Sequence, residues 1–118
     1  MDIDKNYYEE LDEMVPDHSR IERIKIYINE TLSGDLRATT VSQKFELSVS
    51  TLLHLFQQQQ KQSYHQYVED VRMGKAFYLV QQGKRVKEVI HATGYKNRST
   101  FYNAFKKKFK HPPRYFSK

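Results

Sequence analysis

Two stretches of this chain repeat the same short helical pattern. The first covers residues 48–56 and the second residues 97–105. Each starts with a residue whose short polar side chain can cap a helix, Ser48 or Asn97, and places large apolar residues four and eight positions later. That spacing puts the two apolar side chains on one face of a helix. The chain therefore contains one capped, one-sided helix twice, and each copy needs other segments to cover its apolar face.

Apolar residues recur at helical spacing throughout the chain, and no segment alternates with the period of a half-buried strand. The sequence therefore predicts an all-α fold of about seven helices. The first helix is expected from a cap at Ser19 to Gly34, a residue type common just past a helix end. Its apolar stripe is formed by Ile21, Ile24, Ile28 and Leu32.

A short helix, a tight turn and a capped second helix occur at residues 38–60 and again at residues 86–110. In the first short helix Val41 and Phe45 are expected to be buried. Between the two units, Ser63 starts a long helix of some eighteen residues, about 27 Å, closed by Gly83. After Pro112 and Pro113, Tyr115 and Phe116 are expected to fold back as an apolar lid.

This pattern predicts two helix-turn-helix subdomains joined by a long linker helix. The expected division is an acidic N-terminal tail or linker at 1–18, a first unit at 19–62, a connecting helix at 63–83 and a second unit at 84–118.

The charge of the chain is distributed very unevenly. The total is +6, but residues 72–118 carry thirteen basic side chains against the single acidic Glu88, whereas residues 1–16 carry six acidic side chains against Lys5. A strongly basic end attracts a polyanion and makes its binding depend on salt. The acidic front end could be a loose tail, a competitor for the basic face or the end of a linker from a sensor domain.

Several function classes find no support in the sequence. There is no cysteine, no apolar run of the roughly 20 residues that a bilayer span needs, and no secretory signal pattern at the start, so the simplest expectation is a cytoplasmic chain without membrane contact. There is no Gly-rich phosphate loop, and the five histidines lack metal-ligand spacing. We expect no enzyme activity, no cofactor, no metal and no small-molecule site.

Over about residues 20–116 the chain resembles the DNA-binding domain of the AraC/XylS transcriptional regulators. The matching residues of the second half are Val86, Val89, Gly94, Tyr95, Asn97, Ser99, Thr100, Phe101, Phe105, Lys106, Lys107, Phe109, Pro113 and Phe116. Those of the first half are Ser48, Leu52, Leu55, Phe56, Ser63, Tyr64, Tyr67, Arg72 and Ala76. Glu46 and Lys61 depart from the pattern, because each stands where the family usually has Gly. A positive φ there costs about 1 kcal/mol relative to Gly.

The resemblance implies that the helices at 49–60 and 98–110 read DNA from the major groove, while their opposite faces are buried. In the second helix the residues expected to face bases are Arg98, Ser99, Tyr102 and Asn103, and those expected at phosphates are Lys106, Lys107 and Lys108. In the first helix Ser50, Leu53 and His54 are expected to face bases and Gln57 a phosphate. Leu53 could pack on a thymine methyl, and an ordinary solvent-exposed role remains open for Leu53, His54 and Arg98.

The resemblance further implies a bacterial transcriptional regulator, more often an activator, whose partners are double-stranded DNA and RNA polymerase. The long helix would hold the two reading helices about 34 Å apart, one DNA turn, so that one chain spans two major grooves. Arg72, in this helix, is expected to act as an internal tether. A helical protein-interaction module remains open as an alternative from the residues. Nonspecific binding of DNA or RNA is disfavoured, because the aromatic side chains fall on core stripes and not on a stacking platform.

Overall fold

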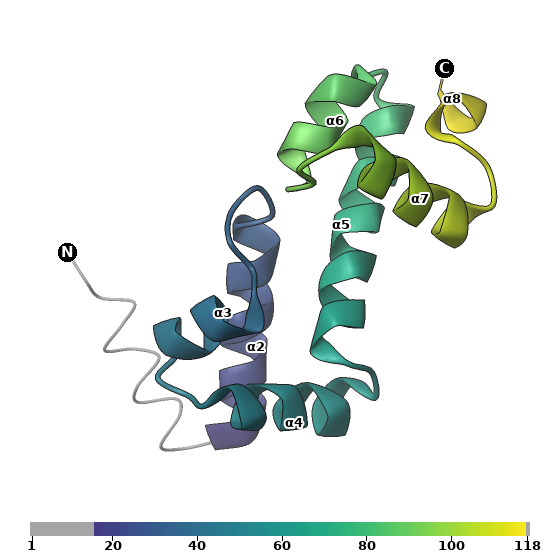
Figure 1. Ribbon diagram of the computed structural model, residues 1–118. Helices are drawn as coiled ribbons and strands as arrows, with labels where there is room; N and C mark the ends of the chain where they lie inside the picture. Colours follow the sequence, from purple (N-terminus) through teal and green to yellow (C-terminus); the bar gives the residue numbers. More distant parts are fainter. Residues whose placement is uncertain (1–15, 118) are drawn as a thin grey trace. The chain divides into compact units, whose positions relative to one another are not determined.

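The computed structural model describes residues 16–117, and all regular secondary structure in this range is helical (Figure 1). This confirms the predicted all-α fold. The helices between residues 16 and 117 are α2 (Pro16–Glu30), α3 (Ala38–Lys44), α4 (Val49–Gln60), α5 (Tyr64–Gln81), α6 (Val86–Ala92), α7 (Arg98–Phe109) and α8 (Pro113–Phe116). The acidic segment is predicted at residues 1–18, and its first fifteen residues lie outside the described range.

The described residues form two compact units. Residues 16–30 and 36–65 make up unit 1, and residues 31–35 and 66–117 make up unit 2. Each unit therefore contains one of the two repeated helices, α4 in unit 1 and α7 in unit 2.

In unit 1, helix α4 packs against α2 and α3. The core is formed by one face of each helix, with Ile21, Ile24, Ile28, Val41, Leu52, Leu55 and Phe56 all buried. Tyr64, at the start of α5, completes this core: its ring meets the edge of Phe56 at 5.1 Å, and its hydroxyl donates a buried hydrogen bond of 2.7 Å to the Leu36 carbonyl. Without this hydrogen bond, burying the Tyr64 hydroxyl and the Leu36 carbonyl would destabilise the fold.

The first helix differs from its predicted bounds. Over the described residues it spans Pro16–Glu30 and does not start after a Ser19 cap. It ends at Glu30. Leu32 is buried as expected, but it lies in a non-helical segment that belongs to unit 2. In the next helix Val41 is buried as predicted, but Phe45 lies just past the end and is only half-buried.

In unit 2, helices α5, α6 and α7 enclose an apolar core. The fully or nearly fully buried members are Met73, Ala76, Val80, Val89, Phe101, Ala104 and Phe105. Phe116 in α8 packs on this core, with ring centroids 4.9 Å from Phe77 and 6.0 Å from both Phe105 and Phe109. The predicted lid is thus correct for Phe116 and wrong for Tyr115, which is 64% exposed and stacks on His111 at 3.8 Å.

Five residues between positions 16 and 117 adopt positive φ, and four of them mark equivalent places in the two units. The turn between the paired short helices contains Glu46 (φ 57°) in unit 1 and Gly94 (φ 84°) in unit 2. The residue after the repeated helix is Lys61 (φ 58°) in unit 1 and Lys110 (φ 68°) in unit 2. The left-handed conformation predicted as a possibility for Glu46 and Lys61 is therefore present, and Lys110 adopts it as well. The fifth residue, Gly83 (φ 82°), follows α5.

Gly94 is the glycine of unit 2 with the least room for a side chain. A Cβ atom there would overlap the carbonyl oxygen of Leu32 and lie 3.2 Å from a guanidinium nitrogen of Arg72. Gly74, in the middle of α5, is the opposite case, because a Cβ there would meet nothing within 4 Å. Only the glycine in the turn is therefore required by packing and by φ.

We predict opposite effects for the same substitution at these two glycines. Gly74→Ala should raise the free energy of unfolding by about 0.5–1 kcal/mol, because alanine favours a helix interior. Gly94→Ala should lower it by about 3 kcal/mol or more, since it adds both a clash and an unfavourable φ. Urea denaturation followed by circular dichroism measures both. Equal effects of the two substitutions would contradict this account of the turn.

A second prediction concerns the left-handed lysine after α4. Lys61→Gly should raise the free energy of unfolding by about 1 kcal/mol, because glycine adopts this φ without steric cost. Gln58→Gly, at an exposed interior position of the same helix, should lower it by about 1 kcal/mol. Urea denaturation distinguishes the two signs, and a loss of stability in Lys61→Gly would show that the lysine side chain contributes more than its backbone conformation costs.

Candidate nucleic-acid interface

The two repeated helices begin with the same capping interaction. In α4 the hydroxyl of Ser48 accepts a hydrogen bond of 3.0 Å from the Thr51 amide. In α7 the side-chain oxygen of Asn97 accepts one of 2.8 Å from the Thr100 amide. Both predicted caps are confirmed. Each cap satisfies an amide that would have no partner in the first turn and so fixes where the helix starts.

Helix α7 separates its faces sharply. Phe101 and Phe105 have no exposed surface, and Ala104 is buried beside them. The opposite face presents three of the four predicted base-reading residues to solvent: Arg98, Ser99 and Asn103 are all exposed. The fourth, Tyr102, is half-buried and its ring lies 5.7 Å from Phe101, edge to face. The exposed base-reading candidates Arg98, Ser99 and Asn103 therefore all lie in the N-terminal half of the helix.

Arg98 and Tyr102 contact each other across one helical turn. The Arg98 guanidinium carbon lies 5.8 Å from the Tyr102 ring centroid, and Nη1 donates to the Tyr102 hydroxyl at 3.4 Å. Because Tyr102 is itself packed on the core, its ring gives the long arginine side chain a fixed surface to lie on. Such a contact reduces the entropy that the arginine would lose on binding.

Helix α4 shows the same separation with a different outward face. Leu52 and Phe56 have no exposed surface, whereas the predicted residues Ser50, Leu53, His54 and Gln57 are all exposed. Leu53 is 37% exposed, which makes it one of the few large apolar side chains on the surface. The face of α4 is thus neutral and partly apolar, and it carries no lysine or arginine.

The basic residues gather at the C-terminal end of α7. Lys106, Lys107 and Lys108 lie in its last turn, where their positive charges interact favourably with the negative end of the helix dipole. Lys110 follows as the C-cap residue. Lys110 donates from Nζ to the Lys107 carbonyl at 3.1 Å. Lys108 differs from Lys106 and Lys107, because its Nζ lies 3.0 Å from Oδ1 of Asp70 on α5.

Sequence reasoning missed two residues beside this basic segment. Lys110 follows the lysine run of α7, separated from it by one residue, and this position in the sequence could have added it to the basic segment. Asp70 could not have been found in this way, since it is thirty-eight positions from Lys108 and only the fold brings the two together.

Arg72 lies inside unit 2, as expected for an internal tether. Its guanidinium carbon is 5.8 Å from the Tyr95 ring centroid, next to Gly94. Burial raises the pKa of Tyr95 to about 12; the negative charge of Glu69 adds to this shift and the positive charge of Arg72 opposes it. The tyrosine is therefore held neutral as part of the packing around the turn.

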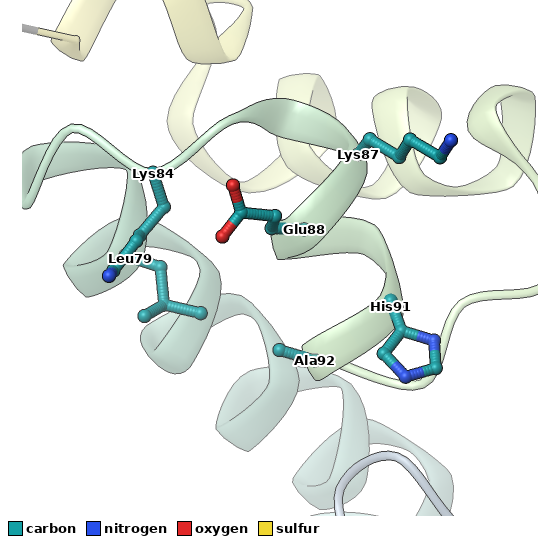
Figure 2. A pocket seen from close by; sticks show the side chains of 6 residues that line it. All are labelled: Leu79, Lys84, Lys87, Glu88, His91 and Ala92. Atoms are coloured by element: carbon teal, nitrogen blue, oxygen red, sulfur yellow. The ribbon is translucent and has the colours of Figure 1, made fainter.

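A shallow pocket of about 510 Å³ lies elsewhere on unit 2 (Figure 2). Its side chains come from the end of α5, from the turn that follows and from one face of α6, and they are Leu79, Lys84, Lys87, Glu88, His91 and Ala92. None of the predicted DNA-contacting residues lines it. Within the part of the chain that the structure describes, no group of His, Cys, Asp or Glu side chains could hold a metal ion, and no helix is long and apolar enough to cross a membrane.

Two short helix pairs, each ending in a capped helix with one buried and one exposed polar face, define a DNA-binding protein with two helix-turn-helix units. A family model described as a helix-turn-helix domain matches residues 41–118, and the chain belongs to this family, in its AraC-type form. It is therefore a DNA-binding domain of transcriptional regulation and not an enzyme.

Two similar proteins carry names consistent with this family. The chain is 32% identical over 93 residues to an uncharacterized HTH-type transcriptional regulator, YijO of Escherichia coli strain K12, covering 78% of this chain and 33% of that protein. It is 28% identical over 99 residues to the Msm operon regulatory protein of Streptococcus mutans, covering 83% of this chain and 36% of that protein. The chain thus spans about a third of the length of these relatives.

A similar solved structure is the C-terminal domain of AraT, a response regulator from Geobacillus stearothermophilus. The TM-score is 0.78 at 25% identity, with 82% of each chain covered. The likeness extends over nearly all the residues that the structure describes.

A prediction follows from the buried tyrosine. In the unfolded chain a tyrosine ionises near pH 10, whereas folded Tyr95 keeps its proton to about pH 12. Between these values the unfolded state releases the proton first, so the free energy of unfolding should fall as the pH rises from 10 to 12. Tyr95→Phe should flatten this decline in urea denaturation, and Tyr78→Phe, at an exposed tyrosine, should leave it in place. An unchanged decline in Tyr95→Phe would contradict the assignment.

Proposed function

We propose that this chain binds double-stranded DNA at specific sequences, with α4 and α7 each lying in a major groove. The observation that carries the proposal is the division of α7: Phe101 and Phe105 are entirely buried, while Arg98, Ser99 and Asn103 are exposed at the N-terminal half. In helix-turn-helix proteins the N-terminal residues of the second helix are the ones that reach base edges.

The side chains of α7 support different roles along its length. Arg98 can donate two hydrogen bonds to a guanine and Asn103 can pair with an adenine edge, while Ser99 can bond to several bases. Tyr102 supports Arg98 from one side and presents its hydroxyl on the same face. Lys106 and Lys107 are exposed near the end of the helix and suit the phosphate backbone.

In α4 the proposed contacts are weaker and less charged. Leu53 can pack on a thymine methyl, and Ser50 and His54 can hydrogen-bond to base edges, while Gln57 can donate to a phosphate. The exposure of all four side chains opposite the buried Leu52 and Phe56 supports this arrangement.

We further propose that one chain reads two successive major grooves, with α5 as the connection. This helix has eighteen residues, about 27 Å at the usual rise, which is comparable to the roughly 34 Å of one DNA turn. A single chain would then recognise two different half-sites, in agreement with the different outward faces of α4 and α7.

We propose that this chain is part of a bacterial regulator that works through RNA polymerase, with activation as its mode of action. One relative is named as an operon regulatory protein and another as a transcriptional regulator. Because this chain spans about a third of their length, a sensor domain in the same protein is part of the proposal. The cytoplasm is the compartment in which such a protein would meet DNA.

Binding-site selection on random duplex DNA, followed by affinity measurements on the selected site, tests the proposal. Arg98→Ala should relax the preference at one base position and cost about 1–3 kcal/mol on the selected site. Lys106→Ala should instead weaken the selected site and mixed DNA about equally, and reduce the slope of log K against log salt by about one.

The failure of either variant is informative. An unchanged base preference in Arg98→Ala would remove this residue from the reading set, and an unchanged salt slope in Lys106→Ala would remove the phosphate contact. Absence of salt-dependent binding by the unaltered chain to any duplex would favour a helical protein-interaction module instead.

A further inference from the structure

Lys108 stands apart from the other lysines of α7 in its position on the helix. It follows Phe101 by seven residues, Ala104 by four and Phe105 by three, and these three residues are buried. Residues at such spacings share one face of a helix. The Cα atom of Lys108 therefore belongs to the core side of α7, at the end of the helix where the core gives way to solvent.

The side chain of Lys108 reaches a carboxylate on the long helix. Its Nζ lies 3.0 Å from Oδ1 of Asp70, and the same oxygen accepts a hydrogen bond of 2.9 Å from Nε2 of Gln66, one turn earlier on α5. Both partners of the ion pair are partly covered, with side-chain exposures of 44% for Lys108 and 32% for Asp70. Gln66 thus fixes the carboxylate that receives the lysine.

Lys106 and Lys107 are placed differently. They are exposed and form no ion pair with any residue that the structure describes. Lys106 follows Asn103 by three positions and Ser99 by seven, so it continues the outward face on which base contacts are proposed. Only these two of the three adjacent lysines are positioned to meet phosphates.

We propose that Lys108 is not a phosphate contact but a positioning residue, which with Asp70 ties the C-terminal end of α7 to α5 and so sets the orientation of the reading helix within unit 2. The inference rests on the proposed DNA binding by α7. It replaces the phosphate role expected of Lys108 from the sequence and assigns Asp70, which carries the wrong charge for DNA, a part in recognition.

The test compares salt dependence with specificity in the full chain, using the selected site and mixed duplex DNA. Lys108→Gln should leave the slope of log K against log salt unchanged, whereas Lys106→Gln and Lys107→Gln should each reduce it by about one. Lys108→Gln and Asp70→Asn should each lower the ratio of selected-site to mixed-DNA affinity by about two- to fivefold, the range expected for an exposed ion pair.

The charge-exchanged variant Asp70→Lys with Lys108→Asp provides the rescue. It should return the specificity ratio and the urea midpoint toward those of the unaltered chain, because the pair is restored with its charges reversed. Glu22→Gln is the matched control: it removes one negative charge from the exposed pair that Glu22 forms with Lys25 on α2, and it should change neither the ratio nor the slope.

Two results would overturn the inference. A slope reduced by about one in Lys108→Gln would show that this lysine meets a phosphate after all. A slope increased by about one in Asp70→Asn would show that Asp70 withholds Lys108 from the backbone and does not position α7. These failures differ from a failure of the proposed function, in which the unaltered chain itself would show no salt-dependent binding. In that case, lack of rescue of the urea midpoint by the charge-exchanged variant would still disprove the ion pair.

Discussion

The burial of one face of α4 and of α7 is the constraint on which the rest of the structure depends. Leu52 and Phe56 in unit 1, and Phe101 and Phe105 in unit 2, have no exposed surface. Rotating either helix about its axis would expose two large apolar side chains, at a cost of about 1.5–3 kcal/mol each. The face that each helix turns outward is therefore set mainly by the burial of the opposite face. Recognition chemistry can change on these faces while the buried faces keep each helix in place.

The turns show how the same geometry is reached with different residues. Unit 2 places Gly94 where the backbone needs a positive φ and where the Leu32 carbonyl leaves no room for a side chain. Unit 1 reaches a similar φ with Glu46, which is exposed. The left-handed conformation of Glu46 costs of the order of 1 kcal/mol, which is small compared with the free energy gained by burying the core. Glycine is thus indispensable in this fold where a second segment closes over the turn.

Local patterns were sufficient to predict most of the fold. The caps Ser48 and Asn97, the buried stripes and the bounds of α4 and α6 follow from spacing that recurs within a few residues. Spacing does not reveal interactions between distant segments. Leu32 fits the helical stripe of α2 but is buried in the other unit, and the pairing of Lys108 with Asp70 depends on how α7 packs on α5. Helical spacing places Lys108 on the side of the buried Phe101, Ala104 and Phe105, but nothing in the sequence names Asp70 as its partner.

If both helices read DNA as proposed, their outward faces contribute different interactions to binding. Residues 72–118 carry thirteen basic side chains against one acidic one, whereas α4 exposes serine, leucine, histidine and glutamine and no cation. Electrostatic attraction acts over about 8–10 Å at physiological salt, while contacts to a methyl group or a base edge act only at contact distance. Unit 2 would therefore form the first encounter with any duplex. Unit 1 would add little on mixed sequence and its full share only where its own groove fits.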